Sequence, residues 1–361
     1  MRLSSPDGAA PQAFLGLSLL RWNHEVGIMS RRMGRVLAAT LAGGLALSAG
    51  GAALAAPIGM LKQFKVPTAN SQPRAITNGS DDNRWFTESD VNNNFAKIAR
   101  ITTAGTITEF TPTAADGCNS CGISDIAQGP GNILYITNNS RQLMRFNVSP
   151  PAGFEPPVTI PSPIDNLDKL AVSTTAVWIT QASAGLVFRY DISTGQTTSF
   201  SVAGPGDVAV DAAGNAWVTE RDAQDIVRIP AAGGTPTRTP ASDGTNTVTP
   251  VHITVATDGQ VWFTSQVAPA AVGRLTPATN SVRLTFLADN PIPEEIAASP
   301  DGTVWFTQES KGNIANIGND FVLREGKVVK GSGPFGITVA SDANPWYTMK
   351  AANKVATLQL R

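Results

Sequence analysis

The sequence predicts an all-β protein, a seven-bladed β-propeller with four-stranded blades that occupies residues 56–361. The first observation is a recurring strand–turn–strand unit, whose fullest form is Pro-x-x-Ile-x-x-x-x-Asp-Gly-x-x-Trp-Phe-Thr from Pro293 to Thr307. The second is its period, because seven copies carry aromatic residues at steps of 50, 43, 39, 45, 43 and 41 residues: Trp85, Tyr135, Trp178, Trp217, Trp262, Trp305 and Trp346. Repeats of roughly 40–50 residues with several strands each are typical of propeller blades.

Each part of the unit has a local reason. The Asp301-Gly302 pair predicts a tight type I′ hairpin turn, because such a turn needs positive φ at both central residues. The run Val304 to Thr307 is β-branched and aromatic and suits a strand. The tryptophans are interpreted as core residues, since both faces of a blade are covered by its neighbours. A third strand follows with an Arg between apolar residues, as in Lys97–Ile101, and we expect these Arg side chains to be solvated.

Alternating segments at 106–112, 196–200 and 282–286 are predicted to be outermost, fourth strands. The last repeat has no such segment after its third strand at 354–358. Residues 61–66 have the same pattern, so we expect them to pair with 354–358 and to close the ring. The connections 147–163 and 235–250 are rich in Pro or Thr and are predicted to be loops. The mature chain shows no convincing helical periodicity.

The N-terminal residues 1–55 are interpreted as an upstream extension and a secretory signal peptide, with translation starting at Met29. The basic residues Arg31 and Arg32 precede an apolar run to Leu54, and Ala53-Leu54-Ala55 fits a cleavage site. We therefore expect a secreted or periplasmic protein with no membrane span after cleavage, exported by either the Sec or the twin-arginine route. A net charge of −1 without a basic stripe argues against nucleic acid as a partner. A monomer is expected.

The repeated Pro-x-x-Ile…Asp-Gly-x-x-Trp-Phe-Thr unit, followed by strands such as Lys97-Ile98-Ala99-Arg100-Ile101, resembles the streptogramin B (virginiamycin B) lyases over about residues 58–360. The resemblance implies a seven-bladed propeller with a ligand site over its central channel. It also implies Mg²⁺-dependent opening of a cyclic antibiotic by elimination. In that family a His directly after the repeat's Pro acts as general base, helped by Glu residues such as the one that ends Trp-Phe-Thr-Glu.

The family's catalytic pattern is replaced at these positions. Glu294 stands where the general-base His would follow Pro293, and Gln308 stands at the Glu position, with Glu309 beside it. One repeat earlier, Val251 occupies the His position and His252 follows it. These substitutions predict that streptogramin-type ring opening is undetectable or very weak.

The candidate catalytic residues are therefore Glu294, Glu309 and His252, which is the single histidine of the mature chain and would have to serve any Ser-His-Asp triad. Neighbouring strand residues point in opposite directions, so only one of Glu294 and Glu295 is expected to face the channel. Further residues at early positions of the inner strands are predicted to surround the channel mouth and bind a ligand: Arg74, Asp125, Asp207, Glu295 and Phe335.

Cys118 and Cys121 are the only cysteines. Two cysteines are too few for a zinc site of four Cys ligands, and a thioredoxin-type site would need a βαβ pattern, which is absent. In an exported protein these residues are expected to form a local disulfide.

Two classes of function remain open from the sequence. The first is a binding module that holds a small molecule, peptide or glycan at the channel mouth. The second is an enzyme, either a lyase with altered residues or a lactone hydrolase, that uses Glu294 and Glu309. Mg²⁺ is expected as a cofactor only for the lyase, and the sequence does not identify its ligands.

Overall fold

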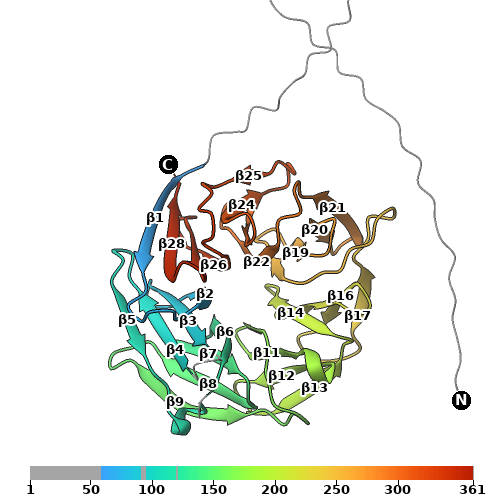
Figure 1. Ribbon diagram of the computed structural model, residues 1–361. Helices are drawn as coiled ribbons and strands as arrows, with labels where there is room; N and C mark the ends of the chain where they lie inside the picture. The colour runs from blue at the N-terminus through green and yellow to red at the C-terminus, as the bar shows by residue number, and fades with distance from the viewer. Residues whose placement is uncertain (1–57, 91–94, 119–120, 361) are drawn as a thin grey trace, which may run out of the picture. The chain divides into compact units, whose positions relative to one another are not determined.

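The computed structural model describes residues 58–90, 95–118 and 121–360. The signal peptide, its cleavage site and the start at Met29 lie outside these residues. Residues from 58 onward form seven four-stranded antiparallel sheets arranged in a ring (Figure 1). In six of these sheets the strands follow one another in sequence order from the inside outward, whereas the seventh sheet takes its outermost strand from the N-terminal end of the chain. This arrangement confirms the predicted seven-bladed propeller.

The first four blades contain the following strands. Blade 1 has β2 (Pro73–Asn78), β3 (Arg84–Asp90), β4 (Phe95–Ile101) and β5 (Ile107–Phe110), and blade 2 has β6 (Ile123–Gln128), β7 (Ile133–Asn138), β8 (Gln142–Asn147) and β9 (Gly153–Thr159). Blade 3 has β10 (Leu170–Val172), β11 (Ala176–Gln181), β12 (Leu186–Asp191) and β13 (Thr197–Ser201), and blade 4 has β14 (Pro205–Val210), β15 (Ala216–Glu220), β16 (Asp225–Ile229) and β17 (Thr237–Pro240).

The remaining three blades complete the ring. Blade 5 has β18 (Ile253–Val255), β19 (Val261–Ser265), β20 (Ala271–Thr276) and β21 (Ser281–Phe286), and blade 6 has β22 (Pro293–Ala298), β23 (Val304–Gln308), β24 (Asn313–Ile317) and β25 (Arg324–Glu325). Blade 7 has β26 (Pro334–Val339), β27 (Pro345–Met349), β28 (Lys354–Gln359) and β1 (Met60–Lys65). Two single-turn 3₁₀ helices, η1 (Ala114–Asp116) and η2 (Ala182–Ala184), are the only helices among the described residues, and neither could span a membrane.

The N-terminal strand closes the ring as the sequence predicts. β1 pairs with β28 along its whole length, from Met60 opposite Gln359 to Lys65 opposite Lys354. Its observed bounds are one residue earlier than the expected 61–66. The ring of Phe64 stacks on the ring of Trp346, and the two ring centroids are 5.8 Å apart. The outer edge of blade 7 is thus supplied by the opposite end of the chain.

The two connections predicted to be loops are partly strands, which corrects that expectation. β9 lies within 147–163 and β17 within 235–250, and each forms the outermost strand of its blade. An outermost strand needs backbone hydrogen bonds on one side only, so it tolerates residues such as Pro156 and Pro157 that lack an N–H. Proline content was therefore a poor guide at these positions.

The hairpin turns also differ from the type I′ expectation. In blade 6 the N–H of Gly302 donates to the carbonyl of Ser299 at 3.1 Å, and Gly302 has φ of +82° while Asp301 has negative φ. The same i→i+3 turn with a left-handed last residue occurs at Gly214, Gly259 and Ala343. The repeat's glycine is thus required at one left-handed position rather than at two.

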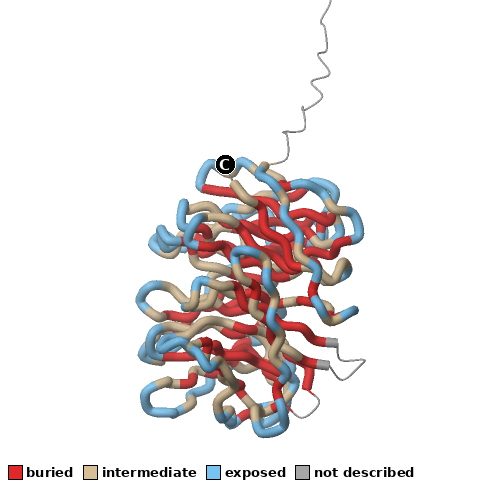
Figure 2. The backbone as a smooth tube through the Cα atoms, turned by 90° about the vertical axis from the view of Figure 1, so that its left-hand side faces the viewer, coloured by how far each residue is buried: buried red, intermediate tan, exposed pale blue. Residues whose placement is uncertain are grey.

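The core lies between blades rather than within one central mass. Trp85 packs with Phe146 of blade 2, whereas the next residue, Phe86, packs with Trp346 of blade 7. Trp85, Trp178, Trp262 and Trp305 are among the largest fully buried side chains, in agreement with their predicted role in the core. The second strands of blades 3 to 7 are buried at every residue, and Figure 2 shows buried residues (red) along the strands and exposed residues (pale blue) mainly in the connecting loops. These packed layers hold the seven inner strands around the channel.

Candidate functional site at the centre of the ring

The seven inner strands line a central channel that contains a cavity of about 510 Å³. Each inner strand has an Ile, Leu or Val at an equivalent position, and we call the residues immediately before these positions the inner ring: the equivalent positions are Ile76, Ile126, Leu170, Val208, Ile253, Ile296 and Ile337. Asp125, Asp207 and Glu295 of the inner ring line this cavity. In five consecutive blades the inner ring carries an ionisable side chain, and in the other two it carries a small residue: Asp125, Lys169, Asp207, His252 and Glu295, with Ala75 and Gly336.

The Thr of each Trp-Phe-Thr unit fixes the inner ring, a role that the sequence analysis did not assign. The side chain of Thr264 accepts a hydrogen bond from the N–H of His252 at 3.3 Å and donates one to the carbonyl of Glu294 in the next blade at 3.2 Å. Thr219 repeats this arrangement with Asp207, at 2.8 Å, and with Val251, at 2.9 Å. One hydroxyl thus positions residues of two neighbouring blades, and its recurrence in the repeat was the signal for it.

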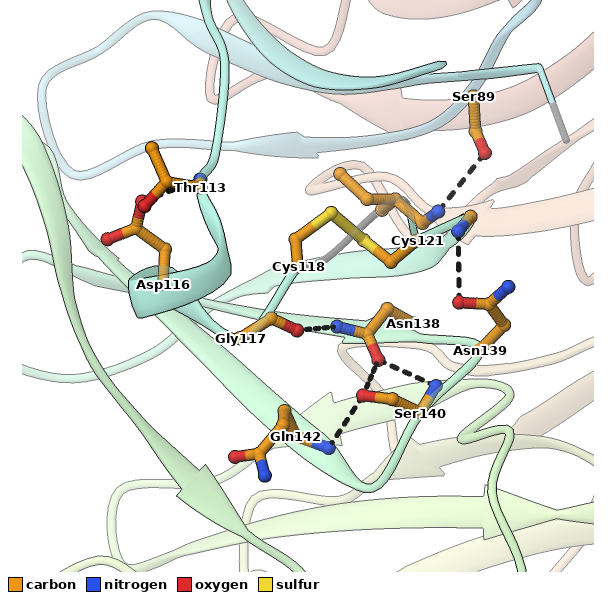
Figure 3. The surroundings of a disulfide bond; sticks show 12 residues. Ser89, Thr113, Asp116, Gly117, Cys118, Cys121, Asn138, Asn139, Ser140 and Gln142 are labelled. Atoms are coloured by element: carbon orange, nitrogen blue, oxygen red, sulfur yellow. Dashed lines mark hydrogen bonds between the residues drawn. A yellow bond between two sulfur atoms is a disulfide. The ribbon is translucent and has the colours of Figure 1, made fainter. Parts of the chain in front are cut away.

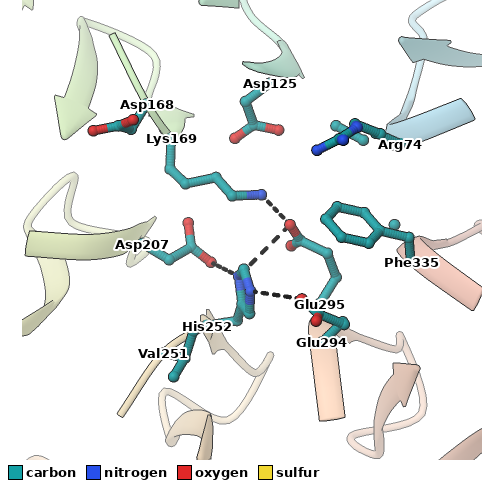
Figure 4. A network of polar contacts seen from close by, with 12 residues as sticks. Arg74, Asp125, Asp168, Lys169, Asp207, Val251, His252, Glu294, Glu295 and Phe335 are labelled. Atoms are coloured by element: carbon teal, nitrogen blue, oxygen red, sulfur yellow. Dashed lines mark hydrogen bonds and ion pairs between the residues drawn. The ribbon is translucent and has the colours of Figure 1, made fainter. Parts of the chain in front are cut away.

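The ionisable side chains of the inner ring contact one another (Figure 4). Lys169 of blade 3 forms an ion pair with Glu295 of blade 6 across the channel. Nδ1 of His252 lies 3.4 Å from Oδ2 of Asp207 and 3.6 Å from Oε1 of Glu295, while Nε2 lies 3.5 Å from Oε2 of Glu294. His252 is 7% exposed and Asp207 is 6% exposed. Five ionisable side chains are therefore held together with little access to water.

Backbone N–H groups hold the carboxylates of this network. Oδ2 of Asp207 accepts from the N–H of Ile253 at 3.2 Å, and its Oδ1 accepts from Val208 at 2.7 Å. Asp125 bonds in the same way to the N–H of Leu170 in the next blade, at 3.1 Å. Each of these Asp residues therefore ties its own blade to the following one.

The network changes the proton affinities of its members. Burial alone would lower the pKa of His252, but Glu295, Asp207 and Glu294 outweigh it and raise this pKa to about 10. Burial raises the pKa of Asp125 to about 7, although the ammonium of Lys169 opposes this. The pKa of Glu295 is lowered because Lys169 and His252 outweigh burial, and the pKa of Lys169 is raised by Glu295.

Both Glu294 and Glu295 reach His252, although only Glu295 lines the central cavity. The pairing of β22 with β23 shifts register between Pro293 and Ile296, so the two Glu residues lie in an irregular segment. Strict alternation of side chains does not hold across such a shift. Similar shifts occur in blades 1, 2, 4 and 7.

A second cavity, which we call the mouth pocket, has a volume of about 320 Å³ and is lined by residues of blades 1, 2, 3 and 7. Its lining includes Arg74, Ser124, Asn139, Asp168, Lys169 and Phe335. The Arg74 guanidinium carbon lies 5.6 Å from the ring centroid of Phe335, and Lys350 Nζ lies 5.2 Å from the same centroid. Arg74 Nε is buried without a hydrogen-bond partner among the described residues. Of the predicted ligand-binding residues, Arg74 and Phe335 thus share this pocket.

The predicted disulfide is present and supports the rim of this pocket (Figure 3). Cys118 and Cys121 are bonded, with their Cα atoms 5.0 Å apart, and directly precede Gly122. The N–H of Gly122 donates to Oδ1 of Asn139 at 3.0 Å, and the N–H of Ile123 donates to Oγ of Ser89 at 3.1 Å. Gly122, Ile123, Ser89 and Asn139 all line the mouth pocket, so the disulfide borders the site.

Comparison with known proteins identifies the family to which the chain belongs. A model of the virginiamycin B lyase family matches residues 168–361, more than half of the chain. The chain belongs to this family. A model of a repeat of unknown function also matches residues 75–221. A search of curated proteins gave no match.

Solved structures agree with the fold of the virginiamycin B lyase family. A streptogramin B lyase structure is 24% identical, with a TM-score of 0.73, and the match covers 84% of this chain and 98% of that one. Virginiamycin B lyase from Staphylococcus aureus is 20% identical, with a TM-score of 0.72 and coverage of 84% and 99%. The extracellular domain of a putative hybrid two-component system from B. thetaiotaomicron is 10% identical, with a TM-score of 0.64 and coverage of 83% and 40%.

Glu294 and Gln308 are the two residues that the sequence resemblance predicts to stand at the family's catalytic His and Glu positions. Glu294 contacts His252, as described above. Gln308 is fully buried, and its side-chain amide has no hydrogen-bond partner among the described residues. Glu309 is half-buried, and burial together with Glu294 raises its pKa. Glu294 and Glu309 are therefore near neighbours, with His252 on the other side of Glu294.

Sequence reasoning missed Lys169 and Asp168. Repeat 3 lacks the Pro and the Asp-Gly pair, so its early residues were not aligned with those of the other repeats. The available signal was Leu170, which corresponds to Ile126 and therefore places Lys169 in the same slot as Asp125.

Proposed function

We propose that this member of the virginiamycin B lyase family is an exported binding protein that holds a small molecule, peptide or glycan in the mouth pocket. The observation that carries the proposal is the arrangement of Arg74, Lys350 and Phe335. Two cationic side chains meet one aromatic ring at the edge of a 320 Å³ cavity that Lys169 also lines. Such a site suits a ligand with an acidic group and an apolar part.

The solved structures give this proposal a precedent on the same fold. One structural neighbour, 8% identical with a TM-score of 0.64, is described as bound to a peptide, and another, of Staphylococcus aureus virginiamycin B lyase, contains quinupristin. The ligand class here is argued from the pocket itself, where Asn139 and Asn166 add hydrogen-bonding groups beside the cations.

Thermal-shift and calorimetric binding measurements test the proposal. The probes are type B streptogramins, peptides with a free C-terminal carboxylate and oligosaccharides that contain uronic acids. Binding should weaken at least tenfold in Arg74→Gln and in Phe335→Ala. Arg189→Gln is the matched control, because Arg189 lies in β12, outside the pocket, and should leave affinity unchanged. A ligand that binds equally well to all these variants would contradict the mouth pocket as its site.

A second candidate function is favoured by the pair Glu294 and Glu309. Two interacting carboxyl groups, one with a raised pKa, can provide a general base and a general acid. The base would remove a proton from the carbon next to a carbonyl, a C=C bond would form between that carbon and its neighbour, and the bond from the neighbour to the ester oxygen would break to release a carboxylate. Alternatively, the base would activate a water that opens a lactone.

The residues present fit the Mg²⁺ that the family implies, because Mg²⁺ is commonly held by one or two carboxylates together with substrate oxygens. Glu294 and Glu309 would hold it, and it would polarise the carbonyl of the bound ester. In either reaction, these two side chains would take up the proton that is removed and would position the carbonyl group.

Mass spectrometry of a type B streptogramin incubated with protein and Mg²⁺ distinguishes the outcomes. Elimination gives a linear product of unchanged mass, whereas hydrolysis adds one water. Turnover that is lost in Glu294→Ala and in Glu309→Ala would establish the enzyme and overturn the pure binding function.

We also propose that the chain is exported, cleaved after Ala55 and monomeric, with residues 56–361 forming the mature propeller. The basic segment and apolar run before Ala55 support this. The N-terminal sequence of protein recovered outside the cytoplasm should begin at Ala56, and sedimentation should give the mass of one chain. Secreted protein that retains residues before Met29 would contradict the proposed processing.

A further inference from the structure

The contacts of His252 are too long for the charge-assisted hydrogen bonds that its surroundings would allow. Hydrogen bonds between an imidazolium and a carboxylate are about 2.7–2.9 Å long. The Nδ1 atom instead lies 3.4 Å from Asp207 and 3.6 Å from Glu295, and this buried atom has no hydrogen-bond partner among the described residues. Three side chains thus point at one another without bonding directly.

These separations match the edges of a metal coordination shell. A tetrahedral ion with bonds of about 2.0–2.1 Å places its ligand atoms about 3.3–3.4 Å apart. One ligand atom each from Asp207, His252 and Glu295 lies within 4.8 Å of the others, and this is the one such group of three found among the described residues. The side chains come from blades 4, 5 and 6, whose packed inner strands fix their positions.

We propose that Asp207, His252 and Glu295 bind a divalent transition-metal ion of the Zn²⁺ type, with Nδ1 of His252 as the nitrogen ligand. One imidazole and two carboxylates are ligands that Zn²⁺ accepts, and a site with three protein ligands leaves a fourth position for water or for a bound molecule. This site is distinct from the Glu294 and Glu309 pair, which offers oxygen ligands only.

The surroundings of the three ligands have the features of a metal site. Nε2 of His252 faces Glu294, and a metal-binding His commonly donates its second ring N–H to a carboxylate. Two backbone N–H groups, from Val208 and Ile253, hold the carboxylate of Asp207. Lys169 pairs with Oε1 of Glu295, the same oxygen that faces Nδ1 of His252, and so fixes its position. The ligand orientations are therefore set before an ion arrives.

The formal charges also favour a bound cation. Asp207, Glu294 and Glu295 contribute three negative charges around the imidazole, and Lys169 contributes one positive charge. A divalent ion with a neutral imidazole brings this sum to zero, and Asp125 adds a fourth carboxyl to the same ring. Buried charge that is left unbalanced is costly.

Binding of Zn²⁺ to the untagged full chain tests the inference. After removal of metals with a chelator, titration with zinc chloride should show one site, which excess Mg²⁺ does not displace. Co²⁺ should bind in its place with the visible absorption of a tetrahedral complex. The chain has only two histidines, His24 and His252, so nitrogen NMR of the imidazoles should show a shift at Nδ1 of His252 alone.

Variants separate ligands from neighbours. His252→Gln and Asp207→Asn should weaken Zn²⁺ binding at least 100-fold, and Glu294→Gln, which alters the group behind the imidazole, should weaken it about 10–100-fold. Glu109→Gln is the control, since Glu109 pairs with Lys97 in blade 1 and should not alter binding. Circular dichroism in chelator establishes that each variant is folded.

Three results would overturn the site. These are failure of the parent to bind Zn²⁺, an unchanged His252 imidazole signal in the presence of Zn²⁺, or parent-like binding by folded Asp207→Asn. The NMR result on the parent decides the question even if a variant does not fold. All of these readouts are independent of ligand binding in the mouth pocket, so the metal site and the proposed function can fail separately.

Discussion

The guanidinium carbon of Arg100 lies 5.9 Å from the ring centroid of Trp85, and the two residues are direct partners across β3 and β4. The same cross-strand pair, at the same distance, recurs in three other blades: Trp178 with Arg189, Trp217 with Arg228 and Trp262 with Arg274. The Arg of the third strand, expected to be solvated, therefore covers the Trp of the second strand. The long Arg stem and planar head give it this role.

Arg100→Gln should lower the free energy of unfolding by about 1 kcal/mol, because it removes a partly desolvated cation–π contact. Trp85→Ala should lower it by about 3–5 kcal/mol, because Trp85 is fully buried. Arg221→Gln is the control, because Arg221 is exposed and lies over no Trp ring of the described residues. Denaturant midpoints measure the differences, and an unchanged midpoint for Arg100→Gln would show that the stacking contributes nothing.

The fold could be predicted because its determinants are local and repeated. Pro293, Gly302 and Trp305 keep a spacing from one another that recurs in other copies, and seven repetitions outweigh any one irregular copy. The strands β9 and β17 escaped prediction because outermost strands carry few buried side chains and tolerate Pro. Their identity depends on pairing with β8 and β16, which local composition does not report.

Ala343→Gly should raise the free energy of unfolding by about 0.5–1 kcal/mol. Ala343 has φ of +63°, at the turn position where other blades have Gly, and a Cβ costs about 1–2 kcal/mol in that conformation, partly offset by the greater freedom of Gly in the unfolded chain. Gly259→Ala is the matched reverse change. Its φ is +79° and an added Cβ would meet no atom within 4 Å, so the backbone alone should make it destabilising. Effects of the same sign for both changes would refute this account.

Phe64→Ala should destabilise the propeller by about 2 kcal/mol, because it removes the stack on Trp346 that holds β1 to blade 7. Lys62→Ala, at an exposed position of the same strand, should have little effect. Deletion of residues 56–66 should cost several kcal/mol, since it removes a strand and opens the ring. Thermal melting measures all three, and a truncated chain that melts like the parent would show that closure is unimportant.

Glu88→Gln should stabilise the protein at pH 8 by about 2 kcal/mol and change little near pH 4.5. Burial, with Glu109 nearby, raises the pKa of Glu88 from its ordinary value of 4.5 to about 7. The folded state then binds the proton more tightly than the unfolded state, so the stability of the parent falls as pH rises from about 4.5 to 7. Unfolding midpoints measured across this range should converge at low pH, and a constant difference between variant and parent would exclude Glu88 as the titrating group.

The candidate site was predicted less completely than the fold. Arg74, Phe335, His252 and the Glu294–Glu295 pair were found because the repeat alignment places them at early positions of inner strands. That both Glu residues reach His252 depends on a register shift, and a periodicity of two does not reveal such a shift. The pairing of Lys169 with Glu295 joins blades 3 and 6 across the channel, so it follows from closure of the ring rather than from any local pattern.

Restoring the family pattern should increase streptogramin ring opening. The double variant Glu294→His with Gln308→Glu should exceed the parent by about 10²–10⁴-fold, the usual contribution of a matched general base. An imidazole with a pKa near ~6.5 is a stronger base at neutral pH than an ordinary carboxylate near ~4.3. The Glu at 308 would supply a carboxylate in place of an amide that now has no partner.

The assay follows the linear product from a type B streptogramin in the presence of Mg²⁺. Gln308→Glu alone is the matched control, because it restores the carboxylate without the base and should stay near the parent rate. Turnover should rise with pH through the imidazole pKa, since only the neutral ring accepts a proton. A folded double variant with no more activity than Gln308→Glu would contradict this prediction. These two residues would then not account for the difference from the active lyases, and the mouth pocket would have to differ as well.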